Sequence, residues 1–205
     1  MLLELALPAL DEAGADGKWT LGGGTGLALK LDHRISYDID IFLEDASHLR
    51  ALSPNRNKSS RAISDRWEEP GNCLRLEREE GAIDFILAAR TTDLTPWLYR
   101  FQGREIPVEE PAEILAKKLK YRGSLIIPRD VFDILAVHHF DSAIVKAAVA
   151  AAPDGARRAA DRIRRIEKRY RETIGDEVNP TATGAELLEV DPLEAADKLS
   201  SCAEA

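Results

Sequence analysis

Two aspartates, Asp38 and Asp40, stand two residues apart in the stretch RISYDIDIF, residues 34–42. Acidic and apolar residues alternate here, which is typical of a β-strand and places both carboxylates on one face, about 6.6 Å apart. Two such carboxylates repel each other, and each costs several kcal/mol to desolvate unless it is paired. Mg²⁺ removes both costs, because it prefers carboxylate oxygens together with the phosphates of a substrate. We therefore interpret this strand as one that binds a metal ion through its two carboxylates.

Asp84 is a third candidate ligand, because it lies in the apolar stretch AIDFILA, residues 82–88, where an unpaired charge is costly. If this strand pairs with residues 37–42, three carboxylates converge. Such a group can hold two metal ions about 3.5–4 Å apart, as in two-metal phosphoryl transfer. The alternatives are a lone salt bridge for Asp84 and a solvent-exposed strand end for Asp38 and Asp40.

The glycine run GGGTG, residues 22–26, could bind phosphate. Backbone N–H groups of Gly23, Gly24 and Thr25 that open onto a helix N-terminus suit an anion, and glycine permits its close approach. A glycine run alone is more often a tight turn. A glycine pair followed, after thirteen residues, by the acidic pattern DID is far more specific.

The whole stretch LGGGTGLALKLDHRISYDIDIF resembles the nucleotidyltransferase signature of the DNA polymerase β superfamily. More narrowly, it resembles the AbiEii/AbiGii toxin family of bacterial toxin–antitoxin systems, whose members read GGTALAL and then HR.S.D.D. Gly26 replaces the usual alanine and Asp32 the usual glycine, and neither change removes a ligand. The matching positions are Gly23, Gly24, Thr25, Leu27, Ala28, Leu29, His33, Arg34, Ser36, Asp38 and Asp40.

A second block, EILAKKLKYRGSLIIPRDVFDIL, residues 113–135, resembles the downstream pattern of the same family. The resemblance assigns the functional lysine to Lys118 and the following arginine to Arg122, one helical turn later, so that both cations face triphosphate. It implies that Asp133 orients Lys118. Arg129 and Asp130 either cap and brace their helix or contact the substrate.

The resemblance also implies a fold and a set of roles. The expected fold is α+β, with a polymerase β-like nucleotidyltransferase core of mixed sheet and flanking helices at residues 1–108 and a helical C-terminal lobe at 109–205. The implied catalytic residues are Asp38, Asp40, Asp84, Lys118 and Asp133; the first three are the Mg²⁺ ligands, and the nucleotide-binding residues are Gly23, Gly24, Thr25, Arg34, Ser36, Lys118 and Arg122.

Local patterns predict the elements that must position these residues. We expect residues 73–79 and 82–88 to form a hairpin, residues 53–71 to be irregular, and residues 104–108, which contain a proline, to form an edge strand. Further strands are expected at 18–21 and 37–42, and helices at 2–14, 26–31, 46–53, 111–123, 128–140, 141–152 and 156–174.

Composition narrows the class of protein. The 205 residues are 44% hydrophobic and 31% charged, as in soluble globular proteins. No apolar run approaches the roughly 20 residues that span a bilayer, and the start lacks a basic segment, so we expect a cytoplasmic protein that contacts no membrane. Cys73 and Cys202 are too isolated to predict a zinc site or a disulfide framework.

The segment RRAADRIRRIEKRYR, residues 157–171, holds eight basic residues in a chain whose net charge is −8. It is either a phosphate-contacting helix or a solvated helix paired with the acidic tail. The resemblance implies a metal-dependent toxin that transfers NMP from NTP to an acceptor hydroxyl, with tRNA favoured as acceptor and a cognate antitoxin as partner. The alternatives are nucleotidylation of a protein or small molecule, and a non-catalytic nucleotide-binding regulatory protein.

Overall fold

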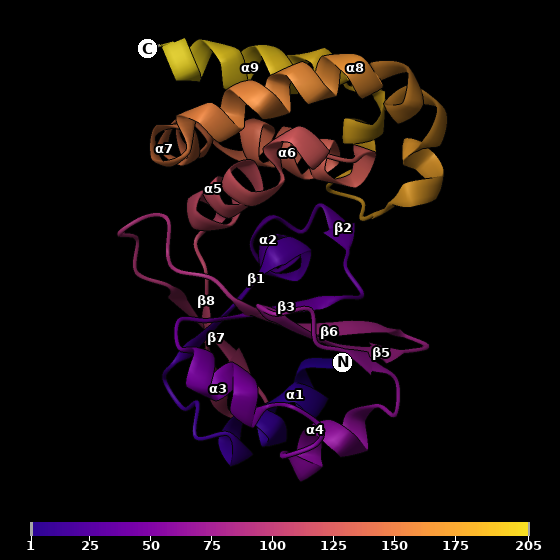
Figure 1. Ribbon diagram of the computed structural model, residues 1–205. Coiled ribbons are helices and arrows are strands. Elements are labelled where there is room, and N and C mark those ends of the chain that lie inside the picture. The colour runs from indigo at the N-terminus through magenta and orange to yellow at the C-terminus, as the bar shows by residue number, and fades with distance from the viewer. Residues whose placement is uncertain (1, 205) are drawn as a thin grey trace. The chain divides into compact units, whose positions relative to one another are not determined.

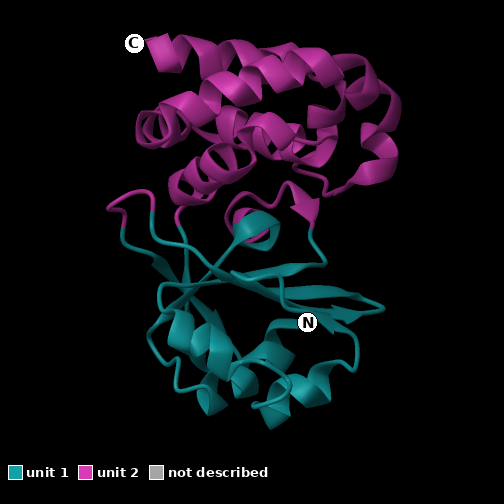
Figure 2. Cartoon of the chain, in the orientation of Figure 1, with its two compact units in different colours: residues 1–26, 36–90, 95–109 teal, residues 27–35, 91–94, 110–205 magenta. Residues whose placement is uncertain are grey.

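The computed structural model of the chain describes residues 2–204, which form two compact units (Figure 2). The first unit comprises the residues up to 26 together with 36–90 and 95–109, and the second comprises 27–35, 91–94 and 110 onward. The second unit therefore includes two short segments from the first half of the chain. A mixed sheet with flanking helices and a helical C-terminal half confirm the predicted α+β class.

Within residues 2–204, the first unit contains a seven-stranded sheet in the order β4-β5-β6-β3-β1-β8-β7 (Figure 1). Strand β3 runs parallel to β6 and β1 runs parallel to β8, while the other neighbouring strands are antiparallel. The strands are β1 (Trp19–Gly22), β3 (Ile39–Leu43), β4 (Trp67–Glu68), β5 (Cys73–Arg78), β6 (Gly81–Leu87), β7 (Trp97–Phe101) and β8 (Arg104–Val108).

One face of this sheet is covered by α1 (Leu2–Glu12), α3 (Ala46–Ala51) and α4 (Lys58–Ile63) (Figure 1). In β3 the side chains of Ile39 and Ile41 are buried, whereas Asp40 between them is only partly buried. Because successive strand residues point to opposite faces, the apolar residues lie under the helices and Asp40 lies on the other face. The period-two pattern therefore predicted the two faces of residues 39–42 correctly, whereas residues 37 and 38 of the expected strand lie outside it.

Two predicted features of the sheet were wrong. Strand β8 is not at an edge, because it lies between β1 and the unpredicted edge strand β7. It tolerates Pro107 because its pairing with β1 is limited to Leu21 and Val108, so that Pro107 needs no N–H for β1. Residues 53–71 are not irregular throughout, since they contain α4 and β4; the Asn57 side chain caps α4 by accepting a hydrogen bond from the Ser60 N–H at 2.8 Å.

Helix α2 (Gly23–Leu31) begins directly at the end of β1. Gly23 adopts φ +59°, a left-handed conformation that favours glycine, and a Cβ there would lie 1.8 Å from Asp40 Oδ2. The glycine thus lets the start of α2 approach the carboxylate of β3. From Leu27 onward the helix belongs to the second unit, where Leu27 and Leu31 join the apolar core.

The second unit is helical apart from the short pair β2 (Arg34–Ile35) and β9 (Asn179–Pro180). Helices α5 (Pro111–Arg122) and α8 (Pro153–Glu177) lie close together, since a Cβ on Gly155 would lie 2.3 Å from the Leu119 carbonyl oxygen. Residues 181–204 also form ordered structure, which includes a 3₁₀ helix and a final α-helix. The elements are α5 (Pro111–Arg122), η1 (Gly123–Leu125), α6 (Pro128–Phe140), α7 (Ser142–Ala151), α8 (Pro153–Glu177), η2 (Ala185–Glu189) and α9 (Pro192–Glu204).

Within residues 2–204, no helix combines the length and the apolar character needed to cross a membrane.

Replacing Gly23 by alanine tests the close approach of α2 to Asp40. Gly17 is the matched control, because it has a similar φ of +64° but a Cβ there would meet no atom within 4 Å. We expect Gly17→Ala to lower the free energy of unfolding by about 1 kcal/mol through backbone strain alone. Gly23→Ala adds an overlap that costs about 1–3 kcal/mol more. Denaturant unfolding measures both, and equal losses would show that the contact with Asp40 is unimportant.

Candidate active site

In the first unit, neighbouring strands bring charged residues into one row across the sheet. Gly22 of β1 pairs with Asp40 of β3, Asp40 pairs with Asp84 of β6, and Asp84 pairs with Arg75 of β5. Residues that pair in register point to the same face. The two carboxylates therefore stand side by side on the sheet face that α1, α3 and α4 leave uncovered, as the predicted pairing of these strands requires.

Asp38 reaches the same region from outside the strand, since β3 begins at Ile39 rather than at residue 37. Its Oδ1 accepts a hydrogen bond from the Ala82 backbone N–H at 3.0 Å, at the start of β6. Its carbonyl oxygen accepts a hydrogen bond from the Thr25 hydroxyl in the first turn of α2. Asp38 thus links the glycine turn to the strand that carries Asp84.

The Asp84 carboxyl is held on one side only. Arg75 Nη1 lies 2.6 Å from Asp84 Oδ2, while Asp84 Oδ1 is buried and has no hydrogen-bond partner among the described residues. Burial raises the pKa of Asp84 to about 6. The Arg75 guanidinium opposes this rise, whereas the Asp40 and Asp38 carboxylates add to it.

These carboxylates fit a divalent cation in the chemistry of their donors. A buried carboxylate oxygen without a partner, beside a second carboxylate on the next strand, is stabilised by a cation that accepts oxygen ligands. Among residues 2–204, however, no group of three or more His, Cys, Asp or Glu side chains is arranged to hold a metal ion together. The three-carboxylate centre of Asp38, Asp40 and Asp84 therefore stays a prediction.

In the second unit, the Asp133 carboxylate is fully buried and binds three cationic or polar side chains. It accepts hydrogen bonds from His33 Nε2 at 2.9 Å and from Arg34 Nε at 2.7 Å, and it lies 3.0 Å from Lys118 Nζ. Burial alone would raise the pKa of Asp133, but Lys118, His33 and Arg34 hold it well below its usual range. Asp133 is thus ionised and contacts Lys118, as its predicted orienting role requires.

Asp130 completes this buried ion network. It lies 2.7 Å from Lys118 Nζ and 3.1 Å from Arg122 Nη2, and it accepts a hydrogen bond from the Ile127 N–H at the start of α6. Asp130 therefore caps its helix and also holds Lys118. Burial lowers the pKa of Lys118, but Asp133 and Asp130 outweigh that effect, so its pKa is raised and the lysine stays protonated.

The predicted nucleotide-binding cations differ in exposure. Arg34 is buried against Asp133, and the Lys118 side chain is 11% exposed between two aspartates. Arg122 is 44% exposed although it pairs with Asp130. Ser36 is partly buried. The resemblance implied that Asp133 contacts Lys118, whereas the pairing of Arg122 with Asp130 and of Arg34 with the distant Asp133 was not predicted. The roles of these cations toward a nucleotide remain predictions.

Arg75 was not predicted as a site residue. The signal was present in the hairpin, because β5 and β6 pair from Arg78 opposite Gly81, with two residues in the turn. Counting back along the antiparallel pair places Arg75 opposite Asp84. The alternation in residues 73–79 predicts the strand, and the length of the turn sets its register.

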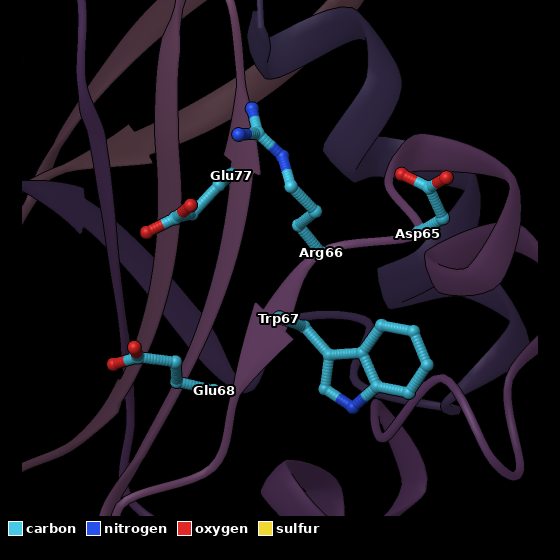
Figure 3. A pocket seen from close by; sticks show the side chains of 5 residues that line it. All are labelled: Asp65, Arg66, Trp67, Glu68 and Glu77. Atoms are coloured by element: carbon cyan, nitrogen blue, oxygen red, sulfur yellow. The ribbon is translucent and has the colours of Figure 1, made fainter.

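The first unit also has an open hollow of about 300 Å³ at the β4 end of the sheet (Figure 3). Trp67 and Glu68 extend to opposite sides of β4 in this view, and Glu77 lies beside Arg66. Residues Asp65, Arg66, Trp67, Glu68 and Glu77 line it. This hollow includes no predicted site residue. The candidate site therefore remains the sheet face that carries Asp40 and Asp84, which we call the acidic face.

Helix α8 is less basic on its surface than its sequence suggests. Most of its cations pair with acids of the same unit: Arg157 with Asp154, Arg164 with Asp161 and Asp197, Lys168 with Glu172, Arg169 with Glu177, and Arg171 with Glu167 and Asp191. The Arg162 guanidinium donates to the Ile126 carbonyl oxygen at 3.2 Å. Two exposed arginines, Arg158 and Arg165, have no acidic partner within residues 2–204.

Comparison with known proteins adds a family match. A family model described as "Nucleotidyl transferase AbiEii toxin, Type IV TA system" matches residues 5–199. The crystal structure of JHP933 from Helicobacter pylori is similar in fold, with a TM-score of 0.50 and 17% identity over 98% of this chain and 88% of that chain. The solution structure of the antibiotic-resistance factor ANT(2″)-Ia gives 0.49 and 16% over 83% and 96%. No curated protein sequence matches.

Replacing Asp133 by asparagine tests the buried ion network. The change keeps the side-chain volume but leaves Lys118 and Arg34 without their shared charge partner, so we expect a loss of about 3 kcal/mol in the free energy of unfolding. Because the folded pKa of Asp133 is depressed, its contribution is present above about pH 4 and is lost as the pH falls through the folded value.

Denaturant unfolding at a series of pH values measures this effect. The difference between wild type and Asp133→Asn is expected to stay constant from about pH 8 to 5 and to shrink below about pH 4. The control is Asp161→Asn, whose exposed carboxylate lies 3.8 Å from Arg164 and is expected to contribute less than about 0.5 kcal/mol. Equal, small losses in both variants would contradict the importance of the network.

Proposed function

The chain belongs to the AbiEii family of nucleotidyl transferase toxins of type IV toxin–antitoxin systems, and on that premise we propose that it transfers NMP from an NTP to an acceptor hydroxyl. Membership of this family classifies the chain as a nucleotidyltransferase. One observation supports the chemistry in this chain most directly. Asp40 and Asp84 stand side by side on neighbouring parallel strands, next to a helix that begins at Gly23.

Asp38, Asp40 and Asp84 would hold Mg²⁺. The partnerless Asp84 Oδ1 and the raised pKa of this carboxyl support the assignment, because both indicate negative charge that lacks a sufficient counter-charge. Bound Mg²⁺ supplies a Lewis acid that activates the attacking hydroxyl and stabilises the departing pyrophosphate. Asp38 has a second task, since its hydrogen bond to the Ala82 N–H fixes its position relative to β6.

The start of α2 would bind the triphosphate. Backbone N–H groups in its first turn have no carbonyl partner within the helix and favour an anion, as do the N-termini of helices generally. The absence of a Cβ at Gly23 and Gly24 allows a phosphate to approach this backbone. Thr25 supports the turn through its hydroxyl, which is already hydrogen-bonded to the Asp38 carbonyl oxygen.

Lys118, Arg122, Arg34 and Ser36 are the further proposed nucleotide-binding residues. Arg122 is the best placed to contact phosphate directly, because almost half of its side chain is exposed. Arg34 is buried against Asp133 and therefore acts on the nucleotide through the network it stabilises. Lys118 stays protonated between Asp130 and Asp133, and Asp133 fixes its position.

We favour tRNA as the acceptor, on the basis of the resemblance and of the two exposed arginines of α8. Arg158 and Arg165 lie seven residues apart, two turns along one side of the helix, and are available to contact a phosphate backbone. Nucleotidylation of a protein or small molecule is the alternative within enzymes. A non-catalytic nucleotide-binding regulatory protein is the alternative of a different class. We also propose a cognate antitoxin as partner and a cytoplasmic location, which membership of a toxin–antitoxin family supports.

Label transfer identifies donor and acceptor together. Purified protein is incubated with Mg²⁺, total RNA and each α-labelled NTP in turn, and label is expected in the tRNA fraction with the preferred NTP. Asp40→Ala is expected to lower the rate at least about a hundredfold, equivalent to about 2.7 kcal/mol of transition-state stabilisation. Asp65→Ala removes an exposed carboxylate of the same unit and is expected to leave the rate unchanged.

The other outcomes separate the alternatives. Label in added protein or small molecules, with none in RNA, would favour the runner-up acceptor. An absence of all transfer, with NTP binding retained and with Asp40→Ala behaving as wild type in growth assays, would favour the regulatory class. Growth arrest on expression, relieved by a neighbouring antitoxin gene, tests the toxin role.

The double variant Arg158→Gln/Arg165→Gln tests the RNA contact. We expect it to raise KM for RNA about tenfold with little change in kcat, and to reduce the dependence of RNA binding on salt, because each lost phosphate contact removes about one unit of that slope. Arg157→Gln/Arg164→Gln is the matched control, since these guanidinium groups already pair with Asp154 and Asp197. Equal effects of both double variants would contradict a specific contact.

A further inference from the structure

Arg75 directly contacts the acidic face of the first unit. It lies on β5, opposite Asp84 in the antiparallel register, and its Nη1 is 2.6 Å from Asp84 Oδ2. A second acid, Glu77, lies 4.0 Å from Arg75 Nε on the same strand. The shorter contact shows that the guanidinium is directed toward Asp84.

This contact determines which oxygen of Asp84 is left for a ligand. Because Oδ2 is occupied by the guanidinium, the carboxylate cannot rotate without breaking a short charge-assisted hydrogen bond. The remaining oxygen, Oδ1, is buried and has no partner in the described part of the chain. One oxygen of Asp84 therefore binds Arg75, and the other is left to bind a ligand.

The contact also differs from an ordinary surface ion pair. The Arg75 side chain is 39% exposed, but the Asp84 side chain is only 14% exposed, and its register neighbour on the other side is Asp40 rather than a cation. Exposed ion pairs contribute little and either partner can leave. Here the guanidinium limits the repulsion between two adjacent carboxylates before any cation binds, which keeps Asp84 in place on the face.

We propose that Arg75 is a positioning residue for a divalent-cation site on this face: it holds Asp84 through Oδ2 so that Oδ1 is presented to the cation beside Asp40. The inference rests on the proposed function, since that function needs the cation. Residues that hydrogen-bond to metal ligands orient them, and their loss commonly lowers metal affinity by 10–100-fold. Arginine suits this task better than lysine, because its planar guanidinium group supplies a positive charge and also fixes the direction of its hydrogen bonds.

Direct titration with Mn²⁺, followed by the electron paramagnetic resonance signal of the free ion, tests the proposal without depending on activity. Wild type is expected to bind Mn²⁺, and Asp40→Asn is expected to lose that binding. Arg75→Gln is expected to bind about tenfold more weakly than wild type. Arg75→Lys is expected to recover part of the loss, because it restores the charge but not the planar guanidinium group.

Arg100→Gln is the matched control, since Arg100 is an exposed arginine on β7 of the same sheet. It is expected to bind Mn²⁺ as wild type does. Denaturant unfolding of each variant, without metal, shows whether it is folded, and Arg75→Lys supplies the comparison if the glutamine variant unfolds.

Two results would overturn the inference. If wild type binds Mn²⁺ but Arg75→Gln binds it equally well or more tightly, Arg75 is a bystander or a competitor of the metal, while the proposed function stands. If wild type does not bind Mn²⁺ at all, the divalent-cation site itself is wrong, and the inference fails together with the metal-dependent part of the proposed function.

Discussion

The first unit is organised around two carboxylates that stand side by side on neighbouring parallel strands. Like charges at this spacing, on a partly buried face, destabilise the fold unless other groups compensate them. The surrounding residues fit that constraint. Gly23 lacks the Cβ that would overlap Asp40, and Arg75 holds one oxygen of Asp84. The covering helices lie on the opposite face, so the charges are not forced into the apolar core.

In the second unit, one carboxylate binds several cations, whereas in the first unit two carboxylates stand next to each other. There a single fully buried carboxylate, Asp133, serves Arg34, His33 and Lys118 at once, and Asp130 binds Lys118 from the start of the same helix. Buried charges of this kind are stable only when every member has a partner. The residues that resemble the family's functional positions are therefore also residues on which the folding of this unit depends.

Local patterns in the sequence predicted much of this architecture. Alternation of apolar and acidic residues identified β3, the turn between β5 and β6 identified their hairpin, and helical spacing identified α5 to α8. Strand β7 and helix α4 were missed, because a short partly exposed strand and a six-residue helix have weak periodicity. The start of β3 was placed too early, since Asp38 follows the same alternation without belonging to the ladder.

Side-chain partners were the least predictable part of the candidate site. Nothing local to Asp133 shows that it contacts Arg34, almost one hundred positions earlier in the chain, and nothing local to α8 shows that most of its arginines pair with acids of its own turns and of the tail. Arg75 is different, because the hairpin register placed it opposite Asp84. Contacts between distant residues depend on packing. The length of a two-residue hairpin turn, by contrast, fixes which residues of its two strands pair.

The measurement that tests the central claim most directly is the location of Mn²⁺ on the folded protein by paramagnetic broadening of backbone amide signals. The account predicts that substoichiometric Mn²⁺ first broadens the amides of Gly22, Gly23, Asp40 and Asp84, which the strand register brings together. Broadening that begins instead around Glu68 and Glu77, or that appears nowhere, would contradict a divalent-cation site on the acidic face.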